Sequence, residues 1–246
     1  MIYRPTKKDL SRLIYKKRYI KLSGDKIFYS IQGEGINIGL PSIFIRLHGC
    51  NLNCSWCDTK YTWDKNKREY WKEPVDITIT KLYKEIKKYP CKHIVITGGE
   101  PLVQQDLITS FINKYKSFSY EIETNGTIQP NSYLLKTVQI NCSPKLSNSK
   151  IDKNKRINLK VIKSINKSMN SNFKFVIGDL DDLEELNRVF VNSKLINKNK
   201  VIVMPLGTSI NENVRVMKNV VDSCQKYNFR IIPRLQNFIW DNKRGI

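Results

Sequence analysis

The sequence lacks any long hydrophobic stretch, and none of its apolar runs approaches the roughly 18 residues that a membrane-spanning helix needs. Its first residues, "MIYRPTKKDLSRLIYKKRY", are basic but contain no apolar segment of the kind that a secretory signal carries. Internal repeats and a clear interdomain linker are also missing. We therefore expect one domain spanning residues 1–246 in a reducing compartment, the cytoplasm, where cysteines bind metals more often than they form disulfides.

Acidic residues are scarce: 22 Asp and Glu against 43 Lys and Arg give a net charge of +21. Such a charge is compatible with a nucleic-acid surface. However, Lys occurs together with Asn in stretches such as "NSKIDKNKRINLK" and "NSKLINKNKV", which contain no aromatic residues that could stack on bases. We interpret these stretches as solvated loops and helix faces and do not expect nucleic-acid binding. An anionic small-molecule substrate would profit from the same positive field.

Short β-rich runs alternate with helical patterns along the chain, and most of these runs are continuously apolar, as in strands covered on both faces. We predict strands at 42–49, 93–99, 120–126, 138–144, 173–178 and 200–207. We predict helices at about 79–89, 101–115, 181–193 and 211–227, with weaker patterns at 131–137 and 155–169. This alternation indicates one α/β domain with a parallel sheet and helices outside it.

Residues suited to chemistry follow four of the predicted strands. Three cysteines follow 42–49, and the segments "TGGEP", "ETNGT" and "SPK" follow the next three strands. Because parallel α/β folds place their chemistry at the carboxyl ends of strands, we expect these segments to form one active-site rim. A binding module without catalysis would not need so many, so the pattern favours an enzyme.

The cysteine cluster "CNLNCSWC" contains three thiols, of Cys50, Cys54 and Cys57, with no obvious fourth. A structural zinc site is closed by four ligands, usually as two separated pairs. The candidates for a fourth zinc ligand are His48, His93, Cys91 and Asp58. The first lies very close to the cluster in sequence, and the next two begin a strand at the edge opposite the expected rim. Zinc therefore stays an alternative, and a zinc-stabilised RNA-binding protein is the function that would accompany it.

An iron–sulfur cubane has four irons that each want one outer ligand, so three cysteines leave one iron open. That iron could chelate a small molecule through an amine and a carboxylate, which suits S-adenosylmethionine (SAM). The spacing C-x3-C-x2-C resembles that of the radical SAM superfamily, in which "TGGEP" would contact the methionyl part of SAM. An electron-transfer iron–sulfur protein would normally ligate all four irons, which three thiolates cannot do.

A longer pattern narrows the resemblance. The stretch "SIQGEGINIGLPSIFIRLHGCNLNCSWCDT" is similar to the 7-carboxy-7-deazaguanine synthase family, and the likeness continues through "TGGEP", "ETNGT", "CSPK" and "WDNKRGI". It leaves out about the first 26 residues and the Lys- and Asn-rich segment 147–170. The resemblance implies a partial (βα)6 radical SAM barrel with an open edge. It also implies an N-terminal extension at 1–26 and a C-terminal tail at 229–246 that caps the substrate.

Members of that family act on 6-carboxy-5,6,7,8-tetrahydropterin. A SAM- and Mg²⁺-dependent radical ring contraction with loss of ammonia gives 7-carboxy-7-deazaguanine, for queuosine and related deazapurines. The resemblance therefore implies a carbon–nitrogen lyase with a 4Fe-4S cluster, SAM and Mg²⁺, a flavodoxin or ferredoxin as electron donor, and a homodimeric state. A glycyl-radical activating enzyme, which shares the cysteine loop, is the nearest alternative, although "QGEG" and "CDT" argue against it.

The resemblance implies three sets of site residues. The metal sets are Cys50, Cys54 and Cys57 for the cluster and Thr59 for Mg²⁺. The SAM set is Trp56, Cys57, Asp58, Gly99, Glu100, Asn125, Ser143, Pro144 and Lys145. The pterin set is Ile31, Gln32, Gly33, Arg46, Thr97 and Ile246.

Some of these assignments have simpler alternatives or departures from the family pattern. Arg46 would pair with the pterin carboxylate, but it could instead be an ordinary ion-pair partner. Thr59 could be a helix N-cap rather than a Mg²⁺ ligand. Glu123 is a further candidate for polar contacts. Family members often have His where this chain has Gln236, which cannot titrate, so no side chain is assigned to proton transfer.

Overall fold

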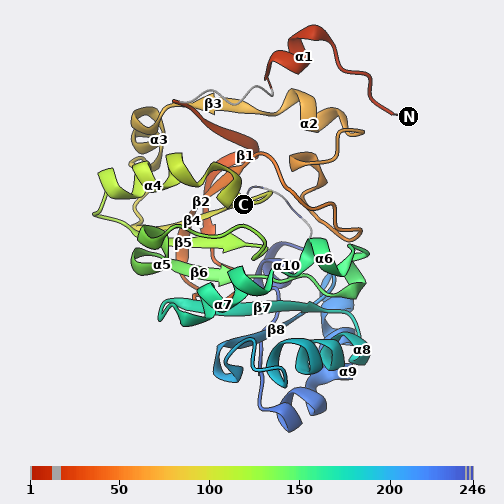
Figure 1. Cartoon of the computed structure of the whole chain (residues 1–246). Coiled ribbons are helices and arrows are strands. Elements are labelled where there is room, and N and C mark those ends of the chain that lie inside the picture. The colour runs from red at the N-terminus through yellow and green to blue at the C-terminus, as the bar shows by residue number, and fades with distance from the viewer. Residues whose placement is uncertain (1, 13–17, 242, 244, 246) are drawn as a thin grey trace.

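Figure 1 shows the computed structural model of the chain, which describes residues 2–12, 18–241, 243 and 245. Within these residues the strands form a single nine-stranded sheet in the order β3-β1-β2-β4-β5-β6-β7-β8-β9. The strands are β1 (Ile20–Ile31), β2 (Pro41–Leu47), β3 (Val75–Ile77), β4 (His93–Gly98), β5 (Ser119–Thr124), β6 (Gln139–Cys142), β7 (Ser171–Ile177), β8 (Val201–Pro205) and β9 (Arg230–Ile231).

Helices connect most of these strands. The α-helices are α1 (Lys7–Arg12), α2 (Arg68–Lys72), α3 (Ile79–Ile86), α4 (Gln105–Lys114), α5 (Ser132–Thr137), α6 (Lys153–Arg156), α7 (Leu159–Lys167), α8 (Leu180–Leu186), α9 (Ile210–Tyr227) and α10 (Leu235–Trp240). Single-turn 3-10 segments are η1 (Lys60–Thr62), η2 (Pro101–Gln104), η3 (Ser147–Ser149) and η5 (Lys198–Lys200), and η4 (Asn187–Val191) is π-helical. No helix among the described residues is long and apolar enough to cross a membrane.

The sheet confirms the predicted α/β class. From β2 to β9 every neighbouring pair is parallel, whereas β1 runs antiparallel to both β2 and β3. The two end strands of the described order, β3 and β9, do not pair with each other, so the sheet is not a closed barrel. All six predicted strands are present, and the predicted helices are present with shifted ends.

Three strands were not predicted. The sequence of β1 does not show the period-2 pattern of a strand, because its pairing with β2 shifts register between Leu22 and Ile27. Gly24 and Lys26, which lie in this interval, both have a φ of 60°. β3 and β9 are too short to show a period. Residues 20–26, which the sequence analysis placed in the N-terminal extension, are therefore part of a strand inside the sheet.

The parallel strands have two chemically different faces. Their outer face carries alternating apolar residues, such as Phe173, Phe175 and Ile177 of β7, which pack in one core with the apolar sides of α3, α4, α5, α7, α8 and α9. The inner face carries polar residues at the intervening positions, among them Lys174 and Glu123. The prediction of strands covered on both faces is confirmed for β7 and β8, in which every residue is buried. Part of the inner face is polar and lines a cavity.

Candidate active site

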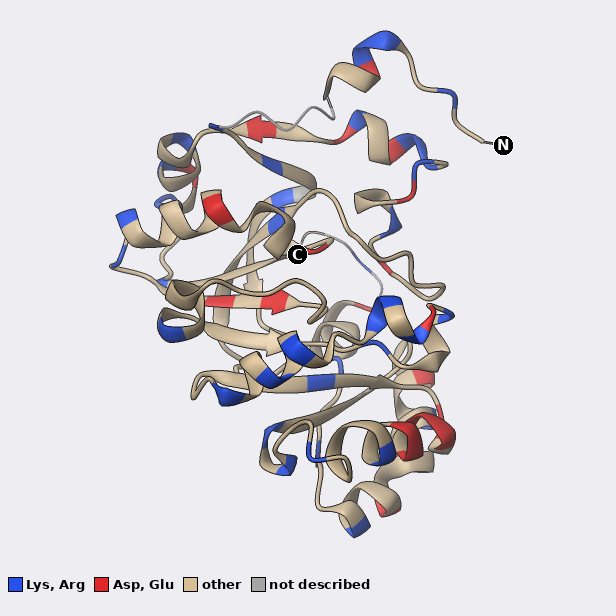
Figure 2. Ribbon diagram, in the orientation of Figure 1, with Lys and Arg blue, Asp and Glu red and all other residues tan. Residues whose placement is uncertain are grey.

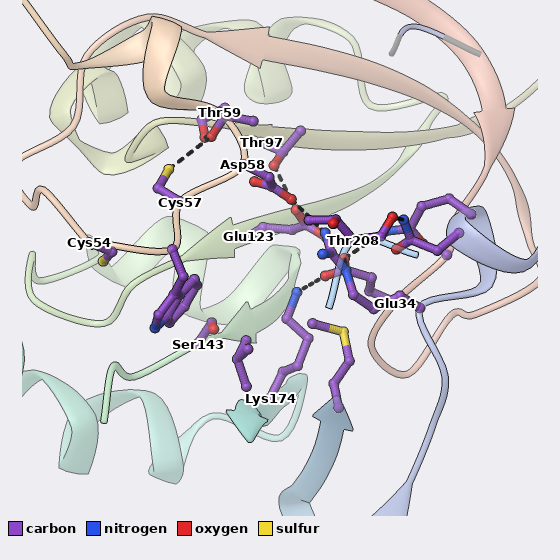
Figure 3. Close-up of a pocket in the computed structure, with 18 of the residues that line it drawn as sticks. Glu34, Cys54, Cys57, Asp58, Thr59, Thr97, Glu123, Ser143, Lys174 and Thr208 are labelled. Carbon is purple, nitrogen blue, oxygen red and sulfur yellow. Dashed lines mark hydrogen bonds and ion pairs between the residues drawn. The ribbon is translucent and has the colours of Figure 1, made fainter. Parts of the chain in front are cut away.

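A cavity of about 690 Å³ opens at the carboxyl ends of the parallel strands, as the sequence predicted. Figure 3 shows its two ends: Cys57 and Thr59 lie at one end, and Glu34 with Lys174 at the other. The cavity brings together most of the predicted site residues. These are Ile31, Gln32, Gly33, Arg46, Cys50, Cys54, Trp56, Cys57, Asp58, Thr59, Thr97, Gly99, Asn125, Ser143 and Lys145.

The three cysteines of the loop after β2 all line this cavity as free thiols. Two of them already accept N–H donors, since the Leu52 amide lies 3.5 Å from Cys50 Sγ and the Trp63 indole 3.2 Å from Cys57 Sγ. Burial raises the pKa of Cys50 to about 12, and a bound metal cation would favour its thiolate form. Burial also raises the pKa of Cys54, and the Lys145 ammonium opposes that rise.

The donor set fits an iron–sulfur cubane. In the described part of the chain, no three His, Cys, Asp or Glu side chains are grouped as ligands of a single metal ion. A cubane does not require such a group, because its thiolates bind three separate irons. N–H donors to the cysteine sulfurs are also a feature of protein iron–sulfur sites, where they tune the cluster.

Two glycines fix the end of β4 against the cysteine loop. A Cβ on Gly98, whose φ is +126°, would lie 2.3 Å from the Leu47 carbonyl oxygen, and one on Gly99 would lie 2.0 Å from that of Gly49. This close approach lets the Gly99 amide donate to Leu47 O at 3.1 Å and the Glu100 amide donate to Gly49 O at 2.8 Å. The "TGGEP" motif therefore holds the cluster loop in position as well as lining the cavity.

Glu100 lies behind the cavity wall. Its fully buried carboxylate accepts from the Leu102 amide at 3.0 Å, the Thr124 hydroxyl at 2.8 Å and the Asn125 amide at 2.7 Å. Burial raises the pKa of Glu100, while these donors and Lys145 oppose the rise. Glu100 thus joins the ends of β4 and β5, and neither it nor Pro144 is among the residues that line the cavity.

A second group of polar side chains surrounds the cysteine end. Lys145 donates to the Ser143 hydroxyl at 3.0 Å and lies 5.3 Å from the centre of the Trp56 ring. The Trp56 indole donates to Asn148 Oδ1 at 3.1 Å. The Asn125 amide group donates to Asn51 in the cysteine loop at 2.9 Å. These contacts give one end of the cavity an aromatic wall, an ammonium and amide groups.

At the other end, the inner face of the sheet holds two carboxylates of β5, those of Glu121 and Glu123. Gln32 donates to Glu121 at 2.5 Å and to Glu123 at 3.4 Å, and the Thr97 hydroxyl donates to Glu123 at 2.6 Å. Burial raises the pKa of Glu123, Lys174 opposes the rise, and the other carboxylates add to it. Glu123 is therefore a carboxyl group on the cavity wall whose pKa is raised chiefly by burial.

Arg46 points into the same end from β2. Its guanidinium lies 5.4 Å from the centre of the Phe28 ring, and Phe28 stacks on Phe44 at 4.9 Å. Among the described residues it forms no ion pair, so the alternative of an ordinary ion-pair partner finds no support. A charged guanidinium with this environment is suited to an anionic ligand.

Thr59 occupies the N-cap position of η1, but its side chain does not cap the helix. Its hydroxyl lies 3.5 Å from Gly98 O and 3.5 Å from Cys57 Sγ, both at the limit of hydrogen-bond distance. The hydroxyl therefore lies at the cysteine end of the cavity, next to Cys57 and the end of β4.

The sequence analysis missed a buried ion network at the end of the cavity opposite the cysteines. Glu34 pairs with Lys174 and with Arg234, whose Nε lies 3.2 Å away, and it accepts from Gln236 at 2.8 Å. Burial would raise the pKa of Glu34, but Lys174 and Arg234 outweigh it and hold that pKa well below its usual range. Arg234 also donates to Asp58 at 2.5 Å, so the network connects the tail to the cysteine loop.

The tail reaches the cavity through close backbone contact. The Leu235 amide donates to Gly33 O at 3.0 Å, and a Cβ on Gly33 would lie 1.7 Å from Gln236 Oε1. Lys243 and Gly245 line the cavity, whereas Ile246 lies outside the described residues. A further missed segment is the end of β8 with the residues after it, where Met204, Leu206, Gly207 and Thr208 line the cavity. The signal for it was Gly207 at the end of the predicted strand 200–207, followed by Thr208.

Comparison with known proteins agrees with this site. Residues 31–166, which include the three cysteines of the loop after β2, match a family model described as "4Fe-4S single cluster domain". A crystal structure of QueE from Escherichia coli is similar with a TM-score of 0.66 and 25% identity, covering 94% of this chain and 99% of that one. The fold, the three thiols and these matches define an iron–sulfur protein of the radical SAM class.

Two relatives narrow the class to a family. 7-carboxy-7-deazaguanine synthase from Pyrobaculum aerophilum is 35% identical over 224 residues, which cover 89% of this chain and 95% of the relative. The protein of the same name from Aquifex aeolicus is 33% identical over 218 residues, covering 86% and 90%. The chain belongs to the 7-carboxy-7-deazaguanine synthase family. This membership favours the iron–sulfur interpretation of the cysteines over the zinc alternative.

Proposed function

We propose that this chain is a 7-carboxy-7-deazaguanine synthase, a carbon–nitrogen lyase that contracts the ring of 6-carboxy-5,6,7,8-tetrahydropterin with loss of ammonia. The observation that carries the proposal is one cavity with two different ends. Three thiols lie at one end, and an unpaired guanidinium lies with buried carboxylates at the other. A SAM molecule and a carboxylated pterin need these two chemistries side by side.

Cys50, Cys54 and Cys57 would hold the 4Fe-4S cluster, which supplies the one-electron reduction of SAM when it is bound. The residues around the thiols would bind SAM itself. The Trp56 ring and the backbone at Gly99 flank the space beside them, and Lys145 with Ser143 offers polar contacts to an amino-acid carboxylate or a ribose. Glu100 would act from behind the wall, by keeping the amide of Asn125 in place.

Arg46 would bind the carboxylate of the pterin, because a guanidinium offers a bidentate fork for such a group. The Thr59 hydroxyl lines the same cavity and would be one oxygen ligand of Mg²⁺, a cation that needs only one or two protein contacts. Mg²⁺ would then meet the substrate carboxylate and stabilise the charge that develops there.

Glu123 would accept hydrogen bonds from the amino and ring N–H groups of the pterin. Its raised pKa also makes it the strongest candidate for moving a proton during the loss of ammonia. The hydroxyl of Thr97 fixes the orientation of this carboxyl group at 2.6 Å. Glu34, already held by two cations and Gln236, would stay ionised and position the tail over the substrate.

The test is anaerobic reconstitution with iron and sulfide, followed by incubation with dithionite, SAM, Mg²⁺ and 6-carboxytetrahydropterin, with products identified by mass spectrometry. We expect 7-carboxy-7-deazaguanine together with 5′-deoxyadenosine. Deoxyadenosine without carboxydeazaguanine would retain the radical SAM class and reject the pterin as substrate. A variant with Cys54→Ala is the matched control and should give neither product. A flavodoxin or ferredoxin as donor and a homodimeric state complete the proposal.

A further inference from the structure

We propose that an exposed lysine turn beside the cysteine loop is the docking surface for an acidic electron-transfer protein of the flavodoxin kind. The lysine turn is defined as residues 150–156, with Lys150, Lys153 and Lys155 exposed. The inference rests on the proposed function, because SAM cleavage needs one electron from outside the chain. The reduced partner loses that electron, and the cluster gains it.

The turn lies directly against the loop that carries the cysteines. The Ser55 amide, between Cys54 and Cys57, donates to Ser149 O at 3.0 Å, and the Ser55 hydroxyl lies 3.4 Å from Asn148 O. Lys150 is the next residue along the chain. The loop itself reaches the surface here, since the side chains of Asn51, Asn53 and Ser55 are exposed around the buried Cys54. A partner seated on the turn would therefore face the cluster loop.

The turn is held rigidly by a buried arginine. Arg156 donates to Lys145 O at 2.8 Å and to Ile151 O at 3.1 Å, so it ties the end of the turn to both its beginning and the SAM-side residues. It also pairs with Glu185 at 2.8 Å, and the other oxygen of Glu185 accepts from the Ser147 amide at 2.8 Å. A rigid charged surface loses little entropy when a partner binds.

The charges of the turn are free for a partner. Among the described residues, Lys150 and Lys153 form no ion pair, and Lys155 meets only Asp152 at 3.5 Å, where both side chains are more than 70% exposed. Such an exposed pair is screened and weak. Figure 2 shows α6 mostly blue, with the red acidic residues of α8 nearby. The exposed Asp181 and Glu184 on α8 would repel an acidic partner and limit its footprint to the side of the lysine turn.

Encounters between redox proteins use small interfaces in which complementary charge sets the association rate. Positive charge beside the point of electron entry is what an acidic donor requires. A net charge of +21 would attract such a donor to the whole molecule, and the lysine turn would determine where it binds.

The test compares two triple variants that change the net charge equally. The first is Lys150→Glu/Lys153→Glu/Lys155→Glu. The matched control is Lys81→Glu/Lys84→Glu/Lys116→Glu, three exposed lysines near the amino ends of β4 and β5. Binding of an oxidised flavodoxin is measured by titration calorimetry at two salt concentrations. 5′-Deoxyadenosine formation is then measured with reduced flavodoxin and, separately, with dithionite.

We expect the first variant to bind flavodoxin about tenfold or more weakly than wild type, and this binding should lose its dependence on salt. Its KM for flavodoxin should rise, while its rate with dithionite stays within about twofold of the wild-type rate. The control should keep most of its affinity. Equal weakening in both variants, or an equal loss of the dithionite rate in the first, would overturn the proposal. RNA binding is measured on the same variants, and a loss of RNA binding in the first variant with flavodoxin binding unchanged would also overturn the proposal. A wild-type protein that binds flavodoxin but never cleaves SAM would contradict the proposed function alone.

Discussion

Replacing Lys174 by Met should destabilise the protein strongly, because it removes the central cation of the buried network. The Lys174 side chain is 7% exposed and that of Glu34 is 13% exposed, so water can replace little of the lost interaction. Breaking a buried ion pair by removing one partner costs about 3–5 kcal/mol. We expect the lower end, about 3 kcal/mol, because Arg234 and Gln236 still contact the Glu34 carboxylate.

For a chain of this size, such a loss corresponds to a fall of about 6–12 °C in Tm. The assay is urea denaturation of anaerobically purified protein, with Lys153→Met as the control for an exposed lysine, which should change stability by less than about 0.5 kcal/mol. Adding Glu34→Gln to Lys174→Met should restore part of the loss, because the carboxylate that has lost one of its two cations is then gone. A loss below about 1 kcal/mol, or a double variant no more stable than Lys174→Met, would refute the reasoning.

Arg46→Ala should lower kcat/KM for the carboxylated pterin about 10- to 100-fold, while 5′-deoxyadenosine formation without substrate stays unchanged. The kcat/KM of Arg46→Lys should lie between those of wild type and Arg46→Ala. Gly98→Ala should reduce the iron bound per chain after reconstitution, because its Cβ would meet Leu47 O at 2.3 Å; Gly39→Ala, also at positive φ but with no atom within 4 Å, should not. The folded state raises the pKa of Glu123, so the wild-type protein should lose stability as this group ionises with rising pH. The Glu123→Gln variant has no such group, so its stability relative to wild type should increase as pH rises. If Glu123 is the base, wild-type activity should rise as pH passes that raised pKa, and the Gln variant should lose this limb of the pH–rate profile.

The sequence predicted those features that depend on local spacing. Six strands and the residues at their carboxyl ends were found because apolar runs and motif letters lie next to each other in the chain. β1 was missed because the bulge between Leu22 and Ile27 breaks its alternation. Glu100 belongs to a predicted motif, yet its carboxylate is fully occupied by backbone and hydroxyl donors behind the cavity wall. A motif shows that a residue matters but not which neighbours its side chain contacts.

The ion network could not be predicted in this way, because its members are far apart in sequence. Glu34 lies 140 residues from Lys174 and 200 from Arg234. One signal was present, since "FKFVIG" has a lysine inside an otherwise apolar strand, and a lysine buried there needs a carboxylate partner. The identity of that partner follows only from the order of the strands in the sheet, from β1 through β2 and β4 to β7, which brings the end of β1 across the cavity from β7.

The two ends of the cavity are therefore assembled by different forces. At the cysteine end, backbone hydrogen bonds hold the loop to β4, and the two glycines permit their approach, so the geometry is encoded in adjacent motifs. At the substrate end, buried charges from β1, β7 and the tail hold one another, and Arg234 links them to Asp58 beside the cysteines. Since a buried charge is tolerated only with its partners in place, removing any one member of this network should weaken the positions of the others, whereas the cysteine end depends mainly on its own loop.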